Sequence, residues 1–315
     1  MLPFPVLSHI LLEFCTRMTR KIIYLINPIS GTRGKGTLRE MVARRTKAAG
    51  IPFEILDTDI AAKYETVRHK IMTESVTDVI VCGGDGSVNQ VVYALADTGV
   101  RFGIVPMGSG NGLAFAAGIP KSSEKALDIV FTGQARLTDA FMVNNQFACM
   151  LCGLGFDAQV AHQFAKQPKR GLATYASLTT RNFFSAGSYL FKIEANKLVF
   201  TTEAFFVSIA NSNQFGNNFT IAPKAVLSDG LLDVVIVKKV AKPLLLLTVM
   251  RQVLAGKLRH IENSLRSPVI YFQTTELSIS NVGNAPMHID GEPRDTPTKL
   301  HIKVMPEYFK LIHAF

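Results

Sequence analysis

Three short apolar runs, each followed at once by a glycine-rich turn, constrain the fold of this chain more than any other feature. The runs are Lys21–Ile26, Asp78–Cys82 and Arg101–Val105, and the turns are Asn27–Gly31, Gly83–Ser87 and Pro106–Asn111. Apolar runs of this length, rich in β-branched residues, predict buried strands. A buried strand that leads through a glycine turn into a helix exposes backbone N–H groups to phosphate at the carboxyl edge of a parallel sheet. Three such edges predict an α/β domain with a nucleotide triphosphate site.

The Gly83–Ser87 turn carries a carboxylate among its glycines. Glycine adopts the positive φ values that bring successive N–H groups close around an anion. Asp85 would repel phosphate unless a divalent cation or a hydroxyl group lies between them, so the turn indicates phosphoryl transfer. An ordinary tight turn is the alternative reading, and the position directly after a buried-strand pattern argues against it. The sequence contains no Walker A run, because Gly31–Gly36 has the wrong spacing.

A change of pattern near residue 140 predicts two domains. Before it, strands alternate with the helical stretches Leu38–Ala49, Ala61–Thr73 and Ser123–Phe131. After it, strands dominate, namely Phe147–Leu151, Tyr189–Ile193, Leu198–Ser208, Leu232–Val237, Leu277–Ser280 and Leu300–Val304. We therefore predict a three-layer α/β nucleotide-binding domain with a parallel sheet over residues 18–140 and a mainly antiparallel β-sandwich over residues 141–315. Residues 1–17 are interpreted as an extension upstream of a start at Met18, and a short packing or membrane-touching segment is the alternative.

Six motifs in order resemble the diacylglycerol kinase catalytic-domain superfamily, which includes bacterial soluble lipid kinases and the sphingosine and ceramide kinases. The motifs are Asn27–Gly31, Gly83–Ser87, Gly108–Asn111, Gly153–Ala158, Asp229–Asp233 and Asp290–Glu292, and the resemblance runs from about Arg20 to the C-terminus. It implies ATP as the phosphoryl donor with Mg²⁺, and a reaction in the cleft between the two domains. The segment from Asp290 onward must then return to the first domain.

The resemblance also implies roles for individual residues. Those expected to contact ATP are Asn27, Pro28, Ser30, Gly31, Thr58, Gly83, Gly84, Asp85, Gly86, Ser87, Asn89, Gly108, Ser109, Gly110 and Asn111. Asp85 is expected close to the catalytic Mg²⁺ and the γ-phosphate. Asp290 or Glu292 is expected to take the proton from the lipid hydroxyl. These two carboxylates are two residues apart, so we expect an extended chain to place both on one face.

Two further sites follow from the resemblance. Asp229, with the backbone carbonyls of Val226 and Leu231, resembles a structural magnesium site remote from the chemistry. Asp157 is a candidate for gripping a polar lipid headgroup, and an N-cap for a helix that opens at Ala158 is the alternative. The favoured acceptor is diacylglycerol or a related lipid. A sphingoid base is the alternative, because Gly112 stands where diacylglycerol-type enzymes usually have Asp. An NAD kinase-like enzyme would share the Gly83–Ser87 loop but would not account for the C-terminal motifs.

Charge and composition favour a membrane partner. The 34 basic and 24 acidic residues give a net charge of +10, which attracts polyanions. With no tryptophan and no RNA-binding aromatic signature, we expect an anionic membrane surface and no nucleic acid. We therefore expect a cytoplasmic, peripherally membrane-associated protein whose partner is its lipid substrate, and we leave a homodimer open. Cys149 and Cys152 lie in one apolar run and are not expected to bind a metal. The leucine-rich stretch Pro243–Leu254 is read either as an interfacial helix or as core packing.

Overall fold

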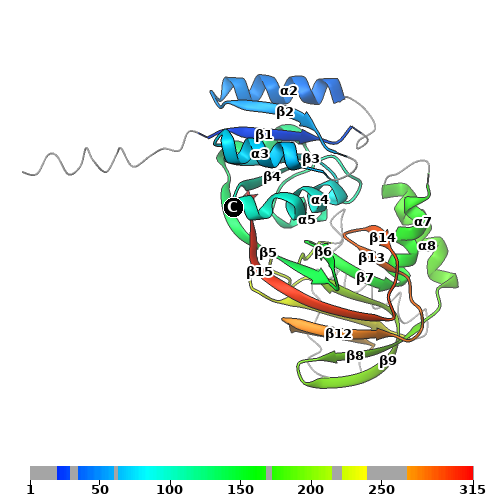
Figure 1. The fold of residues 1–315 in the computed structure, drawn as a ribbon. Coiled ribbons are helices and arrows are strands. Elements are labelled where there is room, and N and C mark those ends of the chain that lie inside the picture. The colour runs from blue at the N-terminus through cyan, green and yellow to red at the C-terminus, as the bar shows by residue number, and fades with distance from the viewer. Residues whose placement is uncertain are drawn as a thin grey trace, which may run out of the picture.

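The computed structural model describes residues 20–28, 35–59, 63–167, 172–214, 222–239 and 268–314. Two bodies of secondary structure follow one another along the chain (Figure 1). The extension 1–17, Ser30, Gly31 and the stretch Pro243–Leu254 lie outside the described residues, so the predictions on them stay predictions. Among the helices that are described, none is both long and apolar enough to cross a membrane.

The N-terminal body is built on a parallel sheet. Its elements are β1 (Ile22–Ile26), α2 (Lys35–Ala48), β2 (Phe53–Asp57), α3 (Glu65–Thr73), β3 (Asp78–Gly83), α4 (Asp85–Leu95), the 3₁₀ turn η1 (Ala96–Thr98), β4 (Arg101–Pro106), α5 (Gly112–Ala116) and α6 (Ser123–Thr132). The strands lie in the order β4-β3-β1-β2, and every pairing among them is parallel. All five residues of β1 are buried, as expected for a parallel strand covered on both faces.

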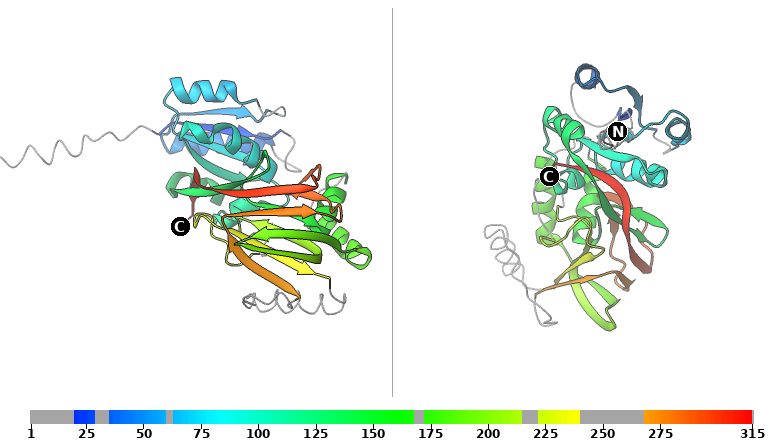
Figure 2. Two further views of the ribbon diagram at one scale, coloured as in Figure 1. Left: turned by 60° about the horizontal axis from the view of Figure 1, so that its bottom comes forward. Right: turned by 90° about the vertical axis from the view of Figure 1, so that its left-hand side faces the viewer.

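Helices cover both faces of this sheet. On one face, Arg45 of α2 forms an ion pair with Asp128 of α6. On the other face, Arg68 of α3 forms an ion pair with Asp97, directly after α4, with Nη1 and Oδ2 2.8 Å apart. Figure 2 shows the two helix pairs on opposite sides of the strands. The prediction of a three-layer α/β domain is therefore confirmed.

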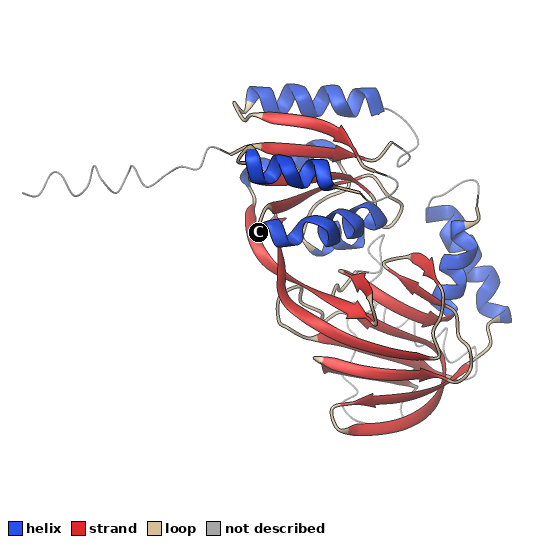
Figure 3. Cartoon of the chain, viewed as in Figure 1, coloured by secondary structure: helices blue, strands red, loops and turns tan. Residues whose placement is uncertain are grey.

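The C-terminal body is mainly antiparallel. Its elements are β5 (Gln134–Val143), β6 (Gln146–Ala148), β7 (Leu151–Gly155), α7 (Phe156–Ala165), α8 (Leu172–Ser185), β8 (Tyr189–Ala195), β9 (Leu198–Ala210), β10 (Leu232–Lys238), β11 (Val269–Thr274), β12 (Glu276–Asn281), β13 (Met287–Ile289), β14 (Glu292–Arg294) and β15 (Lys299–His313). Strands β7, β8 and β10 each pair antiparallel with the long strand β9. A second core of this body contains Phe141 of β5 and Phe191 of β8. Figure 3 shows that strands make up most of this body. This arrangement confirms the predicted β-sandwich.

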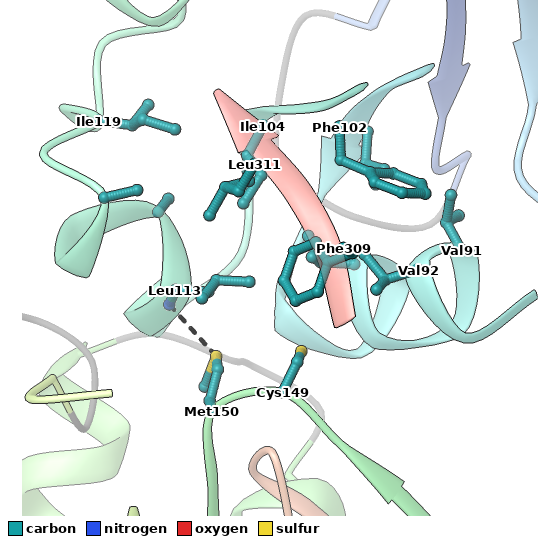
Figure 4. Packing of buried hydrophobic residues seen from close by; sticks show 14 of the residues in the cluster. Val91, Val92, Phe102, Ile104, Leu113, Ile119, Cys149, Met150, Phe309 and Leu311 are labelled. Carbon is teal, nitrogen blue, oxygen red and sulfur yellow. Dashed lines mark hydrogen bonds between the residues drawn. The ribbon is translucent and has the colours of Figure 1, made fainter. Parts of the chain in front are cut away.

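Strand β15 belongs to both bodies. Its first half pairs antiparallel with β12, and β5 pairs antiparallel with it from Ile302 to His313. Near its end, Lys310 and Leu311 pair parallel with Arg101 and Phe102 of β4. The C-terminal segment therefore returns to the first sheet, and residue 140, the expected domain boundary, falls inside β5. Figure 4 shows Phe309 and Leu311 of β15 packed among side chains of the N-terminal core.

One predicted strand is wrong. The apolar run Phe147–Leu151 was expected to be continuous, but β6 ends at Ala148 and β7 begins at Leu151. Cys149 and Met150 form a bend between them and are fully or almost fully buried. The backbone N–H groups at this bend donate to the carboxylate of Asp290, so tertiary contacts replace the ladder that the run alone would favour.

Candidate active site

The turns that follow β1, β2, β3 and β4 meet at the carboxyl edge of the parallel sheet. Asn27, directly after β1, donates from Nδ2 to Oγ of Ser87 in the third turn, 2.7 Å away. Thr58, directly after β2, is buried and donates its N–H to the carbonyl oxygen of Ile26 at 3.0 Å. The structure thus brings Asn27, Thr58 and Ser87 to one edge of the sheet, and Ser30 and Gly31 lie outside the described part of the chain.

The turns after β3 and β4 touch through their glycines. A Cβ built on Gly108 would lie 2.7 Å from Cα of Gly84, which no side chain tolerates. Asn111 closes the turn after β4, because its side chain accepts from the backbone N–H of Gly108 at 2.8 Å and donates to the carbonyl oxygen of Gly108 at 2.8 Å. Asn111 has φ 57°, in the left-handed region that asparagine enters more readily than most residues. The two turns thus lie against each other at their glycines and fit the cradle expected for phosphate.

Helix α4 opens from this cradle with Gly84 as its N-cap and Asp85 as its first residue. The Asp85 carboxylate lies close to the backbone N–H groups of Asn111, Gly112 and Leu113 at the start of α5, and the N–H of Leu113 donates to Sδ of Met150 at 3.2 Å. Burial, and then the charge of Asp290, raise the pKa of Asp85 to about 7, while those N–H groups act in the opposite direction. A cation bound beside this carboxyl group would favour the charged form and lower its pKa.

The carboxylate of Asp290 is enclosed by donors. Its Oδ1 accepts from the backbone N–H groups of Met150 at 3.0 Å and Leu151 at 2.9 Å. Its Oδ2 accepts from the backbone N–H of Cys149 at 3.0 Å and from the Asn89 amide at 2.7 Å. Asn89, expected to contact ATP, is buried one turn into α4, and its amide group donates to Asp290 and to the carbonyl oxygen of Phe147. Asp290 thus ties α4 to the bend between β6 and β7.

Asp290 and Gly291 are the two central residues of the hairpin that joins β13 to β14. Both have positive φ, 49° and 82°, and Ile289 pairs with Glu292 across the turn. Positive φ at both central residues defines a type I′ turn, for which Asp-Gly is a preferred sequence. The expectation that Asp290 and Glu292 share one face of an extended chain is therefore wrong, because the chain reverses between them.

This turn separates the two candidate bases. Asp290 points inward and is 3% exposed, whereas Glu292 is an exposed residue. A Cβ built on Gly86 would lie 3.2 Å from Oε1 of Glu292, so the Glu292 carboxylate lies against the first turn of α4. Of the two carboxylates, Glu292 is the one that combines an exposed position with contact to the glycine turns.

Asp157 lies in the first turn of α7 and is 6% exposed. Its Oδ1 accepts from the N–H of Ala158 at 2.8 Å, and its Oδ2 lies 3.4 Å from Nε2 of His288. The N-cap of α7 is Gly155, so the alternative of an Asp157 N-cap is wrong. Its expected contact with a lipid headgroup stays a prediction. Sequence reasoning missed His288, a single histidine in a short apolar strand.

At the expected magnesium site around Asp229, carboxylate oxygens accept hydrogen bonds from backbone N–H groups. Oδ1 of Asp229 accepts from the N–H of Leu231 at 3.0 Å, and Gly230 donates to Oδ2 of Asp139 at 2.7 Å. Burial, and the nearby charge of Asp139, raise the pKa of Asp229. In the part of the chain that the structure describes, no group of three or more His, Cys, Asp or Glu side chains could hold a metal ion. The magnesium sites at Asp85 and at Val226, Asp229 and Leu231 remain predictions.

Comparisons with known proteins agree with this architecture. A family model described as the diacylglycerol kinase catalytic domain matches residues 21–143. A second, described as the YegS C-terminal NAD kinase beta sandwich-like domain, matches residues 151–313. A probable lipid kinase YegS-like from Shewanella frigidimarina is 26% identical over 266 residues, covering 81% of this chain and 84% of that protein. A diacylglycerol kinase from Bacillus subtilis is 27% identical over 277 residues, covering 86% of this chain and 89% of that protein.

The fold is also similar to a solved structure. The crystal structure of a diacylglycerol kinase from Bacillus anthracis superposes with a TM-score of 0.69 at 19% identity, covering 95% of this chain and 98% of that one. A parallel sheet with glycine turns at its carboxyl edge, joined by one strand to an antiparallel sandwich, defines a two-domain kinase. The chain belongs to the diacylglycerol kinase catalytic-domain superfamily, together with the YegS-like lipid kinases.

Proposed function

We propose that this kinase transfers the γ-phosphate of ATP to the hydroxyl of a membrane lipid, with diacylglycerol or a related lipid as the favoured acceptor. The observation that carries the proposal is the exposed Glu292 carboxylate against Gly86, at the N-terminus of α4 and beside the glycine turns. Relatives that match over most of this chain are diacylglycerol kinases and YegS-like lipid kinases. Phosphoryl transfer to an alcohol requires such a carboxylate together with donors for the phosphate.

The residues around the glycine turns fit a nucleotide phosphate. Gly84 and Gly108 leave backbone exposed where any side chain would collide, and the N-terminus of α4 favours an anion. Asn27 and Ser87, already hydrogen-bonded to each other, would lie beside the phosphates. Asp85 would hold Mg²⁺, which supplies charge stabilisation at the transferred phosphate.

Glu292 and Asp290 have different roles in this proposal: one accepts a proton, and the other holds the turn in place. Glu292 receives the proton of the lipid hydroxyl, because its carboxylate is exposed beside the helix start. Asp290 holds the turn that carries Glu292, because its carboxylate already accepts from the backbone of Cys149, Met150 and Leu151. Asp290 is also only 3% exposed, so its carboxylate offers little surface to a lipid hydroxyl.

The positive net charge supports peripheral association of the protein with a membrane. The net charge of +10 attracts it to the anionic cytoplasmic face of a membrane, where a lipid acceptor is presented. We propose that it works there from the cytoplasm. Rates on vesicles should then rise with the fraction of anionic lipid and fall as salt screens the attraction.

The test uses radiolabelled ATP, Mg²⁺ and a total lipid extract, with labelled products separated by chromatography and identified by mass spectrometry. We expect one labelled lipid class, with kcat lowered about 100-fold or more in Glu292→Gln. Glu40→Gln is the matched control, since Glu40 is exposed on α2 and belongs to no part of the site. A labelled sphingoid base would favour the alternative acceptor. With NAD added to a parallel reaction, label in NADP and none in any lipid would contradict the proposal.

A further inference from the structure

A buried histidine contacts the turn that carries Glu292. His288 lies in β13 and is 1% exposed. Its ring Nδ1 accepts the backbone N–H of Gly291 at 3.2 Å, and Gly291 is the residue directly before Glu292. A ring nitrogen that accepts a hydrogen bond carries no proton, so the neutral ring carries its proton on Nε2. The side chain therefore has one defined orientation, with an acceptor for the turn and a donor on the opposite edge.

The other edge of the ring lies beside Asp157. Nε2 of His288 lies 3.4 Å from Oδ2 of Asp157, at the start of α7, which is longer than a normal hydrogen bond. A carboxylate this close to a ring nitrogen favours the tautomer that carries the proton on that nitrogen. Asp157, His288 and Gly291 thus form a chain of contacts from helix α7 to the hairpin turn.

Gly153 provides the space for this chain. In the register of β7 and β13, Gly153 lies opposite His288. A Cβ built on Gly153 would lie 2.1 Å from Oδ2 of Asp157 and 2.4 Å from Nε2 of His288. The pair therefore occupies the volume directly above the Gly153 backbone. The glycine and the aspartate of the Gly153–Ala158 motif are both accounted for by this pair.

We propose that His288, oriented by Asp157, is a positioning residue that fixes the Asp290–Glu292 turn and so aims the Glu292 carboxylate at the start of α4. The kinetic part of this inference rests on the proposed function of Glu292. Asp290 holds the turn by its side chain, and His288 holds it at the next peptide group. Asp157 then acts on the reaction through His288 and not by contact with the lipid.

Two substitutions separate the contacts of the ring. In His288→Asn, the amide oxygen takes the place of Nδ1 and still accepts from Gly291, while the contact with Asp157 is lost. In His288→Gln, the amide reaches the place of Nε2 and still meets Asp157, while the acceptor for Gly291 is lost. His288→Leu removes both. We expect His288→Asn to keep kcat within about threefold of wild type, and His288→Gln and His288→Leu to lower kcat about tenfold or more. The KM for ATP should stay unchanged in all three.

Stability should follow the opposite order. His288→Gln keeps the contact with Asp157 and should unfold at higher urea than His288→Asn, although it is the less active variant. Losses of kcat that follow the losses of stability across the three variants would overturn the inference, because they would mean that the pair serves only the fold. The same holds if His288→Gln is the more active of the two.

A spectroscopic measurement tests the geometry apart from activity. The ¹⁵N shifts of the His288 ring should show an unprotonated Nδ1 and a protonated Nε2 in the wild-type protein. The amide signal of Gly291 should move in His288→Gln and stay in place in His288→Asn. A protonated Nδ1 in wild type overturns the inference even if an Asn variant fails to fold. Absence of lipid kinase activity in wild type, with these shifts observed, would count against the proposed function alone.

Discussion

Asp290→Asn should cost the protein a large part of its stability. Oδ1 of Asp290 accepts from the backbone N–H groups of Met150 and Leu151, and Oδ2 accepts from the Asn89 amide and from the backbone N–H and thiol of Cys149. An asparagine whose oxygen takes the place of Oδ2 turns its amide group toward the two donors of Oδ1. Two buried donors without an acceptor cost about 1 to 3 kcal/mol each, or about 2 to 6 kcal/mol together. Part of this is offset, because the charge that raises the pKa of Asp85 also disappears.

The assay is urea unfolding at 25 °C, with the free energy of unfolding extrapolated to water. Glu292→Gln is the comparison, because Glu292 is exposed and a surface substitution should change stability by no more than about 0.5 kcal/mol. The two variants should therefore differ in the quantity that falls: Asp290→Asn lowers the free energy of unfolding, whereas Glu292→Gln lowers kcat and leaves the free energy of unfolding almost unchanged. If Asp290→Asn keeps the wild-type free energy of unfolding and loses only kcat, Asp290 takes part in the reaction and the division of roles is wrong.

Three further outcomes are expected. Asp85→Asn should lower kcat at saturating ATP about 100-fold or more, and a variant that retains over a tenth of kcat contradicts its charge-stabilising role. Gly108→Ala should lower the free energy of unfolding by about 1 to 3 kcal/mol and raise the KM for ATP, because its Cβ would lie 2.7 Å from Cα of Gly84. Gly187→Ala is the control, since a Cβ there meets nothing within 4 Å, and an equal effect at both positions would refute the steric argument. Burial raises the pKa of Asp233 to about 7, whereas an aspartate in the unfolded chain ionises near pH 4. Between these values the folded state holds a proton that the unfolded state has released. The free energy of unfolding therefore falls as the pH rises from about 4, and the loss is complete once the pH has risen through 7. In urea unfolding, Asp233→Asn should therefore gain stability relative to wild type from about pH 5 to pH 8, by at most about 4 kcal/mol, and a difference independent of pH would show that the group ionises normally.

The N-terminal half could be predicted from sequence because its signals are local. The apolar runs Lys21–Ile26, Asp78–Cys82 and Arg101–Val105 are short, rich in β-branched residues and followed by glycine-rich turns, and each matches a strand of the observed sheet to within one residue. Parallel strands end at one edge, so the position of the turns followed without knowledge of distant contacts. The change to an antiparallel body after about residue 140 was predictable for the same reason, from the spacing of strand patterns alone.

The parts that could not be predicted depend on partners far apart in the sequence. The bend at Cys149 and Met150 interrupts an apolar run that has the pattern of a continuous strand, and its cause is Asp290, 140 positions after Met150. The pairing of His288 with Asp157 likewise depends on the register of β7 and β13. The two-residue spacing of Asp290 and Glu292 suggested a shared face, but a type I′ turn reverses that relation.

The shared strand β15 has a consequence for how the protein acquires its structure. Strand β4 gains its neighbour β15 only after most of the chain has been synthesised, and Lys310 donates to the carbonyl oxygen of Gly99, 211 positions earlier. During translation, the N-terminal sheet therefore has an unpaired edge at β4 until β15 has been synthesised. An unpaired strand edge can pair with another chain and cause aggregation. Closure over so long a loop is slow, so we expect the nucleotide site to reach its final form together with the sandwich and not before it.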